Sequence, residues 1–261
     1  IGYSGDDGEG FELRRALGRV PEVDLTYFQT TPERQTFTYS KPLLHRPNQP
    51  PEELSRLDII NLTPTPANVE AQLISSLAAL APKLDVLIIM DQAGAREMGA
   101  ITPAVLKAIA QIHEIYPALT IIADSRHGLT NFPPFIYKMN AAEFATLTRS
   151  SSCDLSEIES GAAHFAKLNQ HPVFITLAEQ GMIGATPDGE SAHVPALPTR
   201  GSIDIVGAGD TVTATLALAI AVRATPLESM QLAQAAASLV LPQLGTTGTP
   251  DPRDLRKLLS T

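Results

Sequence analysis

Apolar stretches of strand length alternate with stretches of helical periodicity along most of this chain. Residues 86–90, 119–124 and 173–177 are short, continuous apolar runs, which is typical of buried strands. Residues 103–116 and 154–169 repeat apolar side chains every three or four positions, as one face of a helix does. Strands that are joined by helical crossovers are usually parallel neighbours in one sheet. The alternation therefore predicts an α/β fold with a doubly wound, mostly parallel sheet flanked by helices.

One region near the start departs from this alternation. Residues 23–45 are rich in Thr, Tyr and Phe, which favour extended strands. Residues 46–53 follow as a polar, proline-rich loop. We expect the segment 23–60 to contain a small β-lid. Thr65 followed by Pro66 then predicts a helix that has Thr65 as its N-cap.

The composition limits the partners that this chain can have. Its 261 residues are 44% hydrophobic, which suits one domain over residues 1–261. The net charge of −9, with no basic block, argues against nucleic acid as a partner. No apolar run reaches membrane-spanning length. The single cysteine, Cys153, excludes an internal disulfide and fits a reducing compartment, so we expect a cytoplasmic protein.

The stretch Gly207-Ala208-Gly209-Asp210 precedes an apolar segment that predicts a helix over about 210–223. Small residues let a backbone turn approach a ligand closely, and the free N–H groups at a helix start form an anion site. A carboxylate there would repel an anion unless it had another task, such as accepting a proton from a hydroxyl that attacks a phosphoryl group. The four residues leave a second interpretation open, in which Asp210 is only the helix N-cap.

Residues 204–212 read DIVGAGDTV, and residues 140–143 read NAAE. These segments resemble the DTxGAGD signature and the NxxE motif of the PfkB/ribokinase family of carbohydrate kinases, and further resemblances follow in the order of that family. Residues 174–182 resemble the strand and turn that meet the nucleotide. Residues 235–249 resemble the helix and loop that close over adenine and a monovalent cation, and residues 2–17 are similar to GxxGxDxxGxxLxxxL. The resemblance implies a ribokinase-like kinase over nearly the whole chain.

Finer matches favour one branch of that family. Four segments resemble the kinases of D-glycero-β-D-manno-heptose 7-phosphate, which phosphorylate an anomeric hydroxyl: residues 56–61, 91–106, 121–126 and 178–182. That branch usually has Asp-Tyr-Gly-Lys-Gly where this chain has Asp-Gln-Ala-Gly-Ala, so the usual lysine is missing. The family's first core strand, its sugar-gripping aspartate and its Gly-Gly-x-x-x-Asn stretch would all lie upstream of Ile1. We therefore expect the sequence to be truncated at its N-terminus.

The resemblance implies a role for each residue of the glycine-rich turn. Asp210 would be the catalytic base that takes the proton of the sugar hydroxyl. The N–H groups of Gly207, Ala208 and Gly209 would form the anion hole for the transferred phosphoryl group.

Further residues would hold ATP and the metal ions. Asn140 and Glu143 would organise Mg²⁺ and the phosphates, Glu143 through water, because Mg²⁺ keeps several of its waters. Asn140 could at the same time cap the helix that follows it. Asp204 and the carbonyl of Val206 would bind a monovalent cation such as K⁺, although Asp204 could also be only a turn residue at a strand end. The remaining nucleotide contacts implied are Thr176, Glu179, Gly181, Ala235 and Gly245.

The candidates for sugar or phosphate binding are less closely tied to the family pattern. Asp91 ends a predicted strand, where ligands bind in open α/β sheets. Arg96 could replace the missing lysine. Arg126 also ends a strand and could hold an anion or form only a surface ion pair. In the lid, Lys41 and Arg34 are candidates for phosphate contact.

The sequence thus predicts an ATP-dependent kinase that acts on a sugar or sugar phosphate, with Mg²⁺ and possibly K⁺ as cofactors. Because lids in this family often form dimer contacts, we also expect a homodimer through the lid. Two alternatives stay open. One is a nucleoside or hexose kinase of the same fold, and the other is a pseudokinase that binds nucleotide or sugar without turnover.

Overall fold

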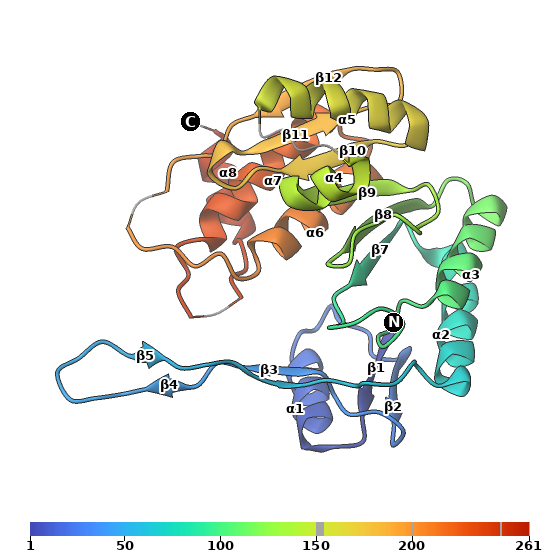
Figure 1. The fold of residues 1–261 in the computed structure, drawn as a ribbon, viewed down its shortest axis with the longest axis vertical. Coiled ribbons are helices and arrows are strands. Elements are labelled where there is room, and N and C mark those ends of the chain that lie inside the picture. The colour runs from blue at the N-terminus through green and yellow to red at the C-terminus, as the bar shows by residue number, and fades with distance from the viewer. Residues whose placement is uncertain (150–153, 200, 246, 261) are drawn as a thin grey trace. The chain divides into compact units, whose positions relative to one another are not determined.

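The computed structural model describes residues 1–149, 154–199, 201–245 and 247–260, so Cys153 lies outside the described residues. The chain divides into two compact units (Figure 1). The first unit comprises residues 1–82 and 92–112, and the second comprises residues 83–91 and 113–261. One kinase domain over residues 1–261 stays a prediction.

The second unit contains a six-stranded sheet of order β12-β11-β10-β9-β8-β7. Its strands are β7 (Val86–Asp91), β8 (Thr120–Ser125), β9 (Ile136–Asn140), β10 (Val173–Thr176), β11 (Met182–Ala185) and β12 (Ser191–Val194). Strands β7 to β10 are parallel, whereas β11 and β12 add two antiparallel pairings. The sheet is therefore mixed. In its parallel part the carboxyl ends lie at one edge, where Asp91 pairs with Ser125 and Asn140 pairs with Thr176.

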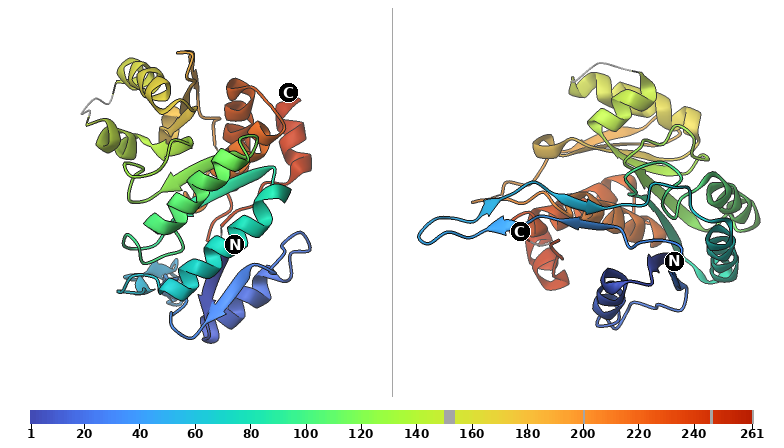
Figure 2. Two further views of the ribbon diagram at one scale, coloured as in Figure 1. Left: turned by 90° about the vertical axis from the view of Figure 1, so that its right-hand side faces the viewer. Right: turned by 60° about the horizontal axis from the view of Figure 1, so that its bottom comes forward.

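Helices cover both faces of this sheet (Figure 2). On one face lie α4 (Ala141–Thr148) and α5 (Leu155–Asn169), and α5 packs on β10, β11 and β12. On the other face lie α6 (Ala208–Ala221) and α7 (Pro226–Val240), which pack on each other and on the sheet. The short helix α8 (Pro252–Leu259), which the sequence analysis did not predict, packs on α7.

The core of the second unit lies between the sheet and the α6–α7 pair. Phe174 and Met182 of the sheet meet Leu216 of α6 and Met230 of α7 in one cluster, and all four side chains are buried. Gly184 belongs to the same layer, because a Cβ atom there would lie 2.6 Å from the Met230 sulfur. This dense packing fixes α6 on the sheet, and with it the turn at which α6 begins.

The first unit contains the predicted lid. Its elements are α1 (Gly8–Leu17), α2 (Ala67–Leu80), most of α3 (Pro103–Ile115), and the strands β1 (Gly2–Gly5), β2 (Phe28–Thr31), β3 (Thr38–Ser40), β4 (Leu43–Leu44), β5 (Glu52–Glu53) and β6 (Leu57–Ile59). Strands β1 and β2 form a parallel pair. The pairs β3–β6 and β4–β5 are antiparallel and form an extended two-stranded ribbon, as the extended segment 23–60 predicted (Figure 1).

Three local expectations were wrong. Thr65 does not cap α2, because Pro66 occupies the N-cap position and the Thr65 hydroxyl donates to the carbonyl of Gly99 at 2.7 Å. The predicted loop 46–53 ends in strand, since Glu52 and Glu53 form β5. The helix expected over 210–223 begins two residues earlier, at Ala208.

Within the described ranges, none of the helices combines the length and the apolar character that crossing a bilayer requires.

We predict that Phe174→Ala destabilises the second unit strongly. Phe174 is fully buried in the central strand β10, so truncation leaves a cavity and should lower the free energy of unfolding by about 3–5 kcal/mol. Phe11→Ala is the matched control, since Phe11 is 63% exposed and should change stability by roughly 0.5 kcal/mol or less. Urea unfolding measures both. Equal losses in the two variants would contradict the assigned core.

Candidate active site

Helix α6 begins with a turn that requires glycine. Gly207 is the N-cap residue and has a φ of 82°, in the left-handed region that side chains disfavour. A Cβ atom at Gly207 would also lie 2.5 Å from Cγ2 of Thr247. Helical residues follow from Ala208 onward, so the N–H groups of the first turn point away from the helix body.

The structure modifies the expected anion hole at this turn. The N–H of Ala208 already donates to the carbonyl of Ile205 at 3.2 Å, so it is not available as expected. For the N–H groups of Gly207 and Gly209, no acceptor lies among the described residues. These two donors and the positive end of the α6 dipole are what the turn offers to an anion.

Asp210 is not the N-cap of α6. Gly207 holds that position, and no side chain among the described residues caps this helix. The carboxylate of Asp210 sits in the first turn, is exposed, and has neither a hydrogen bond nor an ion pair to any residue that the structure describes. The capping interpretation is therefore wrong, and the side chain is placed as a base requires, accessible and without a competing proton donor.

Asn140 and Glu143 form a capping box where β9 meets α4. The Asn140 side chain accepts a hydrogen bond from the Glu143 N–H at 2.9 Å, and the Glu143 carboxylate accepts one from the Asn140 N–H at 2.8 Å. The expected capping role of Asn140 is thus present. Only Oε2 of Glu143 takes part, which leaves Oε1 available to accept a hydrogen bond from a metal-bound water. The pair therefore fits a Mg²⁺ ion held through water.

Burial and neighbouring charges shift the pKa of the Glu143 carboxyl. Burial raises the pKa of the Glu143 carboxyl above its ordinary value. The hydrogen bond from the Asn140 N–H lowers the pKa, the negative charge of Asp124 raises it, and the positive charges of Lys138 and Arg126 lower it. Three charged side chains, those of Asp124, Arg126 and Lys138, therefore act on the Glu143 carboxyl.

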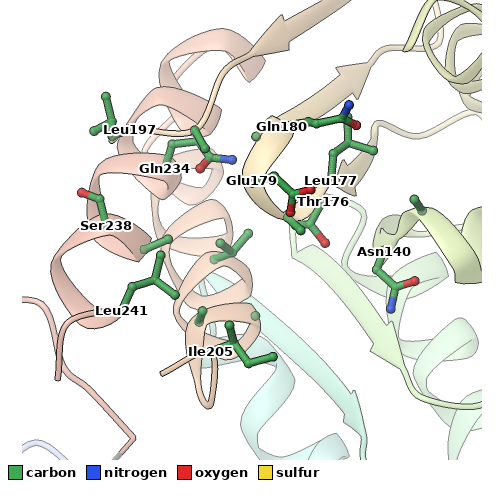
Figure 3. A pocket seen from close by; sticks show the side chains of 18 of the residues that line it. Asn140, Thr176, Leu177, Glu179, Gln180, Leu197, Ile205, Gln234, Ser238 and Leu241 are labelled. Atoms are coloured by element: carbon green, nitrogen blue, oxygen red, sulfur yellow. The ribbon is translucent and has the colours of Figure 1, made fainter. Parts of the chain in front are cut away.

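A cavity of about 930 Å³ opens beside these residues (Figure 3). Its walls are mostly aliphatic, which suits a purine ring, and its volume lies in the range of ligand pockets. Asn140 lies at one side of it, and Ala208 and Gly209 bring the first turn of α6 to its wall. Further lining residues come from the β10–β11 turn, the segment after β12, and α7: Thr176, Glu179, Gly181, Leu197, Pro198, Ile203, Ile205, Gln234, Ser238 and Leu241.

The α7 side of the cavity differs from the expectation. Gln234, Ala237, Ser238 and Leu241 line it, at the spacing of one helix face. Ala235 is not among the lining residues, because its position on the helix turns it into the core, where it is fully buried. In Figure 3 the Gln234 amide points from α7 toward the turn that carries Glu179. The periodicity of segment 227–241 could have identified this face.

Asp204 ties together the loops that were expected to hold a monovalent cation. Its carboxylate accepts hydrogen bonds from the N–H of Val206 at 3.0 Å and from the N–H of Gly245 at 3.1 Å. The three residues thus lie together, as expected. The Gly245 N–H is engaged by Asp204, and Gly245 does not line the cavity. Asp204 therefore has the turn role that was its alternative, and carboxylate oxygens can accept further partners.

The candidates for sugar binding are distributed over both units. In the second unit, buried Asp91 accepts a hydrogen bond from the Ser125 hydroxyl at 2.8 Å, and exposed Arg126 follows at the end of β8. In the first unit, Arg96 is exposed in the loop after β7, and Lys41 of the lid forms an exposed ion pair with Glu53 at 3.4 Å.

Arg34 does not serve as the expected phosphate contact. Its guanidinium is buried in the first unit, where it donates to the hydroxyl and the carbonyl of Thr63 and to the carbonyl of Met98. These bonds use both terminal nitrogens. Arg34 thus joins the start of the lid to two loops of the same unit.

Three charged or polar residues of the site were missed in the sequence. Lys138 forms a buried ion pair with Asp124 at 2.9 Å, and the Thr213 hydroxyl lies 3.1 Å from the same carboxylate. The available signal was a lysine two positions before Asn140, inside an otherwise apolar strand.

The fold and this constellation are those of a phosphotransferase-type site: a helix N-terminus with an exposed carboxylate in its first turn, a second carboxylate that could hold a metal ion through water, and a cavity of ligand size. Residues 52–253 match the family profile described as pfkB family carbohydrate kinase. The chain therefore belongs to the pfkB family of carbohydrate kinases.

Curated relatives and solved structures agree with this assignment. The chain is 26% identical to "Bifunctional protein HldE" of Bradyrhizobium sp. (strain ORS 278) over 99% of its length, and 28% identical to the protein of that name from Rhodopseudomonas palustris (strain BisB18), also over 99%. It spans about half the length of these relatives, 51% in both cases.

The solved structures establish the ribokinase-like fold. An Arabidopsis thaliana ribokinase complexed with ribose and ATP has a TM-score of 0.72 and 20% identity, covering 100% of this chain and 81% of the other. Phosphofructokinase-2 from Escherichia coli in complex with potassium has a TM-score of 0.73 and 16% identity, covering 99% and 80%.

We predict that Glu143→Gln raises thermal stability at pH 7 but not at pH 4. The raised pKa means that burial disfavours the ionised carboxylate in the folded state. This destabilisation is present at pH values above the folded pKa and disappears once both states are protonated, below the unfolded value near 4.5. Glutamine retains an acceptor for the Asn140 N–H.

Thermal unfolding followed by circular dichroism at the two pH values measures this difference. The control is Glu157→Gln, which changes an exposed glutamate in the first turn of α5 and should give no pH-dependent gain. A gain for Glu143→Gln that is the same at pH 4 and pH 7 would contradict the argument.

Proposed function

We propose that this chain is an ATP-dependent sugar kinase in which Asp210 is the catalytic base. The observation that carries the proposal is the start of α6. There, an exposed carboxylate follows two backbone N–H donors, and none of these groups has a partner among the described residues. This turn forms part of the wall of a cavity large enough for a nucleotide. A residue that only capped the helix would accept a hydrogen bond from the first turn, which Asp210 does not do.

The shape and chemistry of the cavity support a site for the nucleotide there. The aliphatic side chains of Leu197, Ile205 and Leu241 can enclose the adenine ring, and the Gln234 amide can hydrogen-bond to its polar edge. The phosphates then extend toward Asn140 and toward the first turn of α6, where the helix dipole favours negative charge.

Phosphoryl transfer follows from this placement. The hydroxyl oxygen of the sugar attacks the γ-phosphorus in line with the bond to the leaving ADP oxygen, and Asp210 takes the hydroxyl proton as the new P–O bond forms. The N–H groups of Gly207 and Gly209 donate to the phosphoryl oxygens as charge develops on them. A Mg²⁺ ion held through water by Glu143 would neutralise phosphate charge.

The acceptor that we favour is a heptose phosphate or a related sugar phosphate. Support comes from the sequence matches to that kinase branch and from the similarity to proteins named HldE. Asp91 at the end of β7 can accept hydrogen bonds from sugar hydroxyls, and the exposed Arg126 side chain can pair with a phosphate. A nucleoside or hexose kinase is the second candidate on the same fold.

Two further parts of the proposal rest on loops and on the lid. K⁺ would bind beside Asp204, which already joins the segments of Val206 and Gly245. The lid exposes apolar side chains on its strands, including Leu43 and Leu57 at 53% and 64% exposure, and a homodimer through the lid would bury them.

The test is ADP release from ATP and Mg²⁺ in the presence of a panel of sugars, sugar phosphates and nucleosides. If ADP is released with only one of these acceptor classes, that class contains the substrate. Absence of turnover with every acceptor, while ATP still raises the melting temperature, would show that the chain is a pseudokinase instead.

We predict that Asp210→Asn lowers kcat by roughly 10²–10⁴-fold with little change in melting temperature. The amide cannot accept the proton, and the side chain makes no bond to the part of the chain that the structure describes. The matched control is Asp254→Asn, which changes an exposed aspartate in the first turn of α8 and should leave kcat unchanged. Retained activity together with a stability loss of about 1 kcal/mol would instead assign Asp210 a purely structural role.

A further inference from the structure

Lys138 is a buried lysine in the middle strand β9 of the six-stranded sheet. It is only 6% exposed, and its neighbours in the strand are apolar. Burying an ammonium group is costly unless the group is paired, and here the Asp124 carboxylate lies 2.9 Å from Nζ. Apolar side chains of similar volume would usually stabilise such a position as well as a buried ion pair does. Fold stability alone therefore does not explain Lys138.

The ion pair lies directly beside the first turn of α6. A Cβ atom added to Gly209 would be 3.4 Å from Lys138 Nζ, so the ammonium group lies close to the Gly209 backbone. Thr213, one turn further along α6, has its hydroxyl 3.1 Å from the Asp124 carboxylate and 3.0 Å from the Gly209 carbonyl. The cluster is thus anchored to the helix that carries Asp210.

The ammonium group has unused hydrogen-bonding capacity. A lysine ammonium carries three N–H donors. Among the residues that the structure describes, Asp124 is the one hydrogen-bond partner of Lys138. A buried cation with two open donor positions, next to the Gly209 N–H, is suited to an anionic oxygen.

We propose that Lys138 donates a hydrogen bond to the phosphoryl group that is transferred from ATP, and that Asp124 and Thr213 are positioning residues that hold its ammonium group beside Gly209. This inference rests on the proposed kinase function. The group contacted is the γ-phosphoryl rather than the α- or β-phosphate, because the phosphoryl group that reaches the hydroxyl deprotonated by Asp210 must lie at this same turn.

The chemical consequence is a fixed positive charge at the reacting centre. Negative charge is spread over the three equatorial oxygens of the phosphoryl group during transfer. A preoriented ammonium in a water-poor site stabilises that charge more than the same group would in water. Lys138 thereby supplements the two N–H donors that remain once the Ala208 N–H is engaged by Ile205.

The test compares nucleotides that differ in one phosphoryl group. In the unmodified protein we expect a nonhydrolysable ATP analogue to bind more tightly than ADP, as measured by calorimetry with Mg²⁺ present. In Lys138→Met the affinity for the analogue should fall by roughly 10- to 100-fold, as expected for the loss of a hydrogen bond to a charged group. The ADP affinity should change by less than about 2-fold, since ADP lacks the group contacted.

Three further variants separate contact from folding. Lys138→Arg keeps a cation and should restore part of the preference for the analogue. Lys138→Met combined with Asp124→Asn removes both charges, so no carboxylate is left buried without a partner, and it should lose the preference as the single variant does. Lys167→Met changes an exposed lysine of α5 and should bind both nucleotides normally.

The outcomes distinguish the two proposals. If affinity for ADP and for the analogue falls equally in the Lys138 variants, or if the double variant keeps the preference, Lys138 only supports the fold and the inference is overturned. Absence of sugar turnover in the unmodified protein would count against the proposed kinase function, whereas the binding comparison would still decide whether Lys138 contacts the terminal phosphoryl group.

Discussion

The packing of α6 on the six-stranded sheet is the contact on which the active site depends. Leu216 and Val212 of α6 enter the same buried cluster as Phe174 of β10, and α6 crosses β7 and β8. Because protein interiors resist displacement, this contact fixes where the helix begins. The turn at Gly207 therefore meets the carboxyl ends of the parallel strands, where Asp91, Asp124 and Asn140 lie.

The charged side chains at the carboxyl ends of β8 and β9 are linked by hydrogen bonds to the first turns of α6. Asp124 holds Lys138 beside Gly209, and Thr213 links the same carboxylate to α6. Glu143, whose pKa is raised by burial, is influenced by both Asp124 and Lys138. In the proposed mechanism these charges hold the phosphate oxygens, and Asp210, which has no partner among the described residues, takes the proton.

Much of the fold and part of the site followed from local sequence patterns. The strands near 86–90, 119–124 and 173–177, the helices near 103–116, 154–169 and 210–223, and the lid were predicted, because apolar periodicity is a local property of the chain. The sequence did not predict which face of a helix lines the cavity, nor which side chains bond to backbone groups far away in the sequence. Ala235 was expected at the nucleotide but faces the core, whereas Gln234 lines the cavity. The Ala208 N–H and the Arg34 guanidinium were assigned to ligands but are engaged by Ile205, Thr63 and Met98.

The sequence by itself determined the family, the alternation of strands and helices, and the glycine-rich turn with its aspartate. Each of these is recognised from short stretches of neighbouring residues. Only the tertiary structure decided that Gly207, and not Asp210, is the N-cap of α6, since capping depends on the backbone angles at Gly207. It alone revealed the Asp124–Lys138–Thr213 cluster, whose members are up to 89 positions apart. Such distant residues come together only when strands and helices pack around a common core.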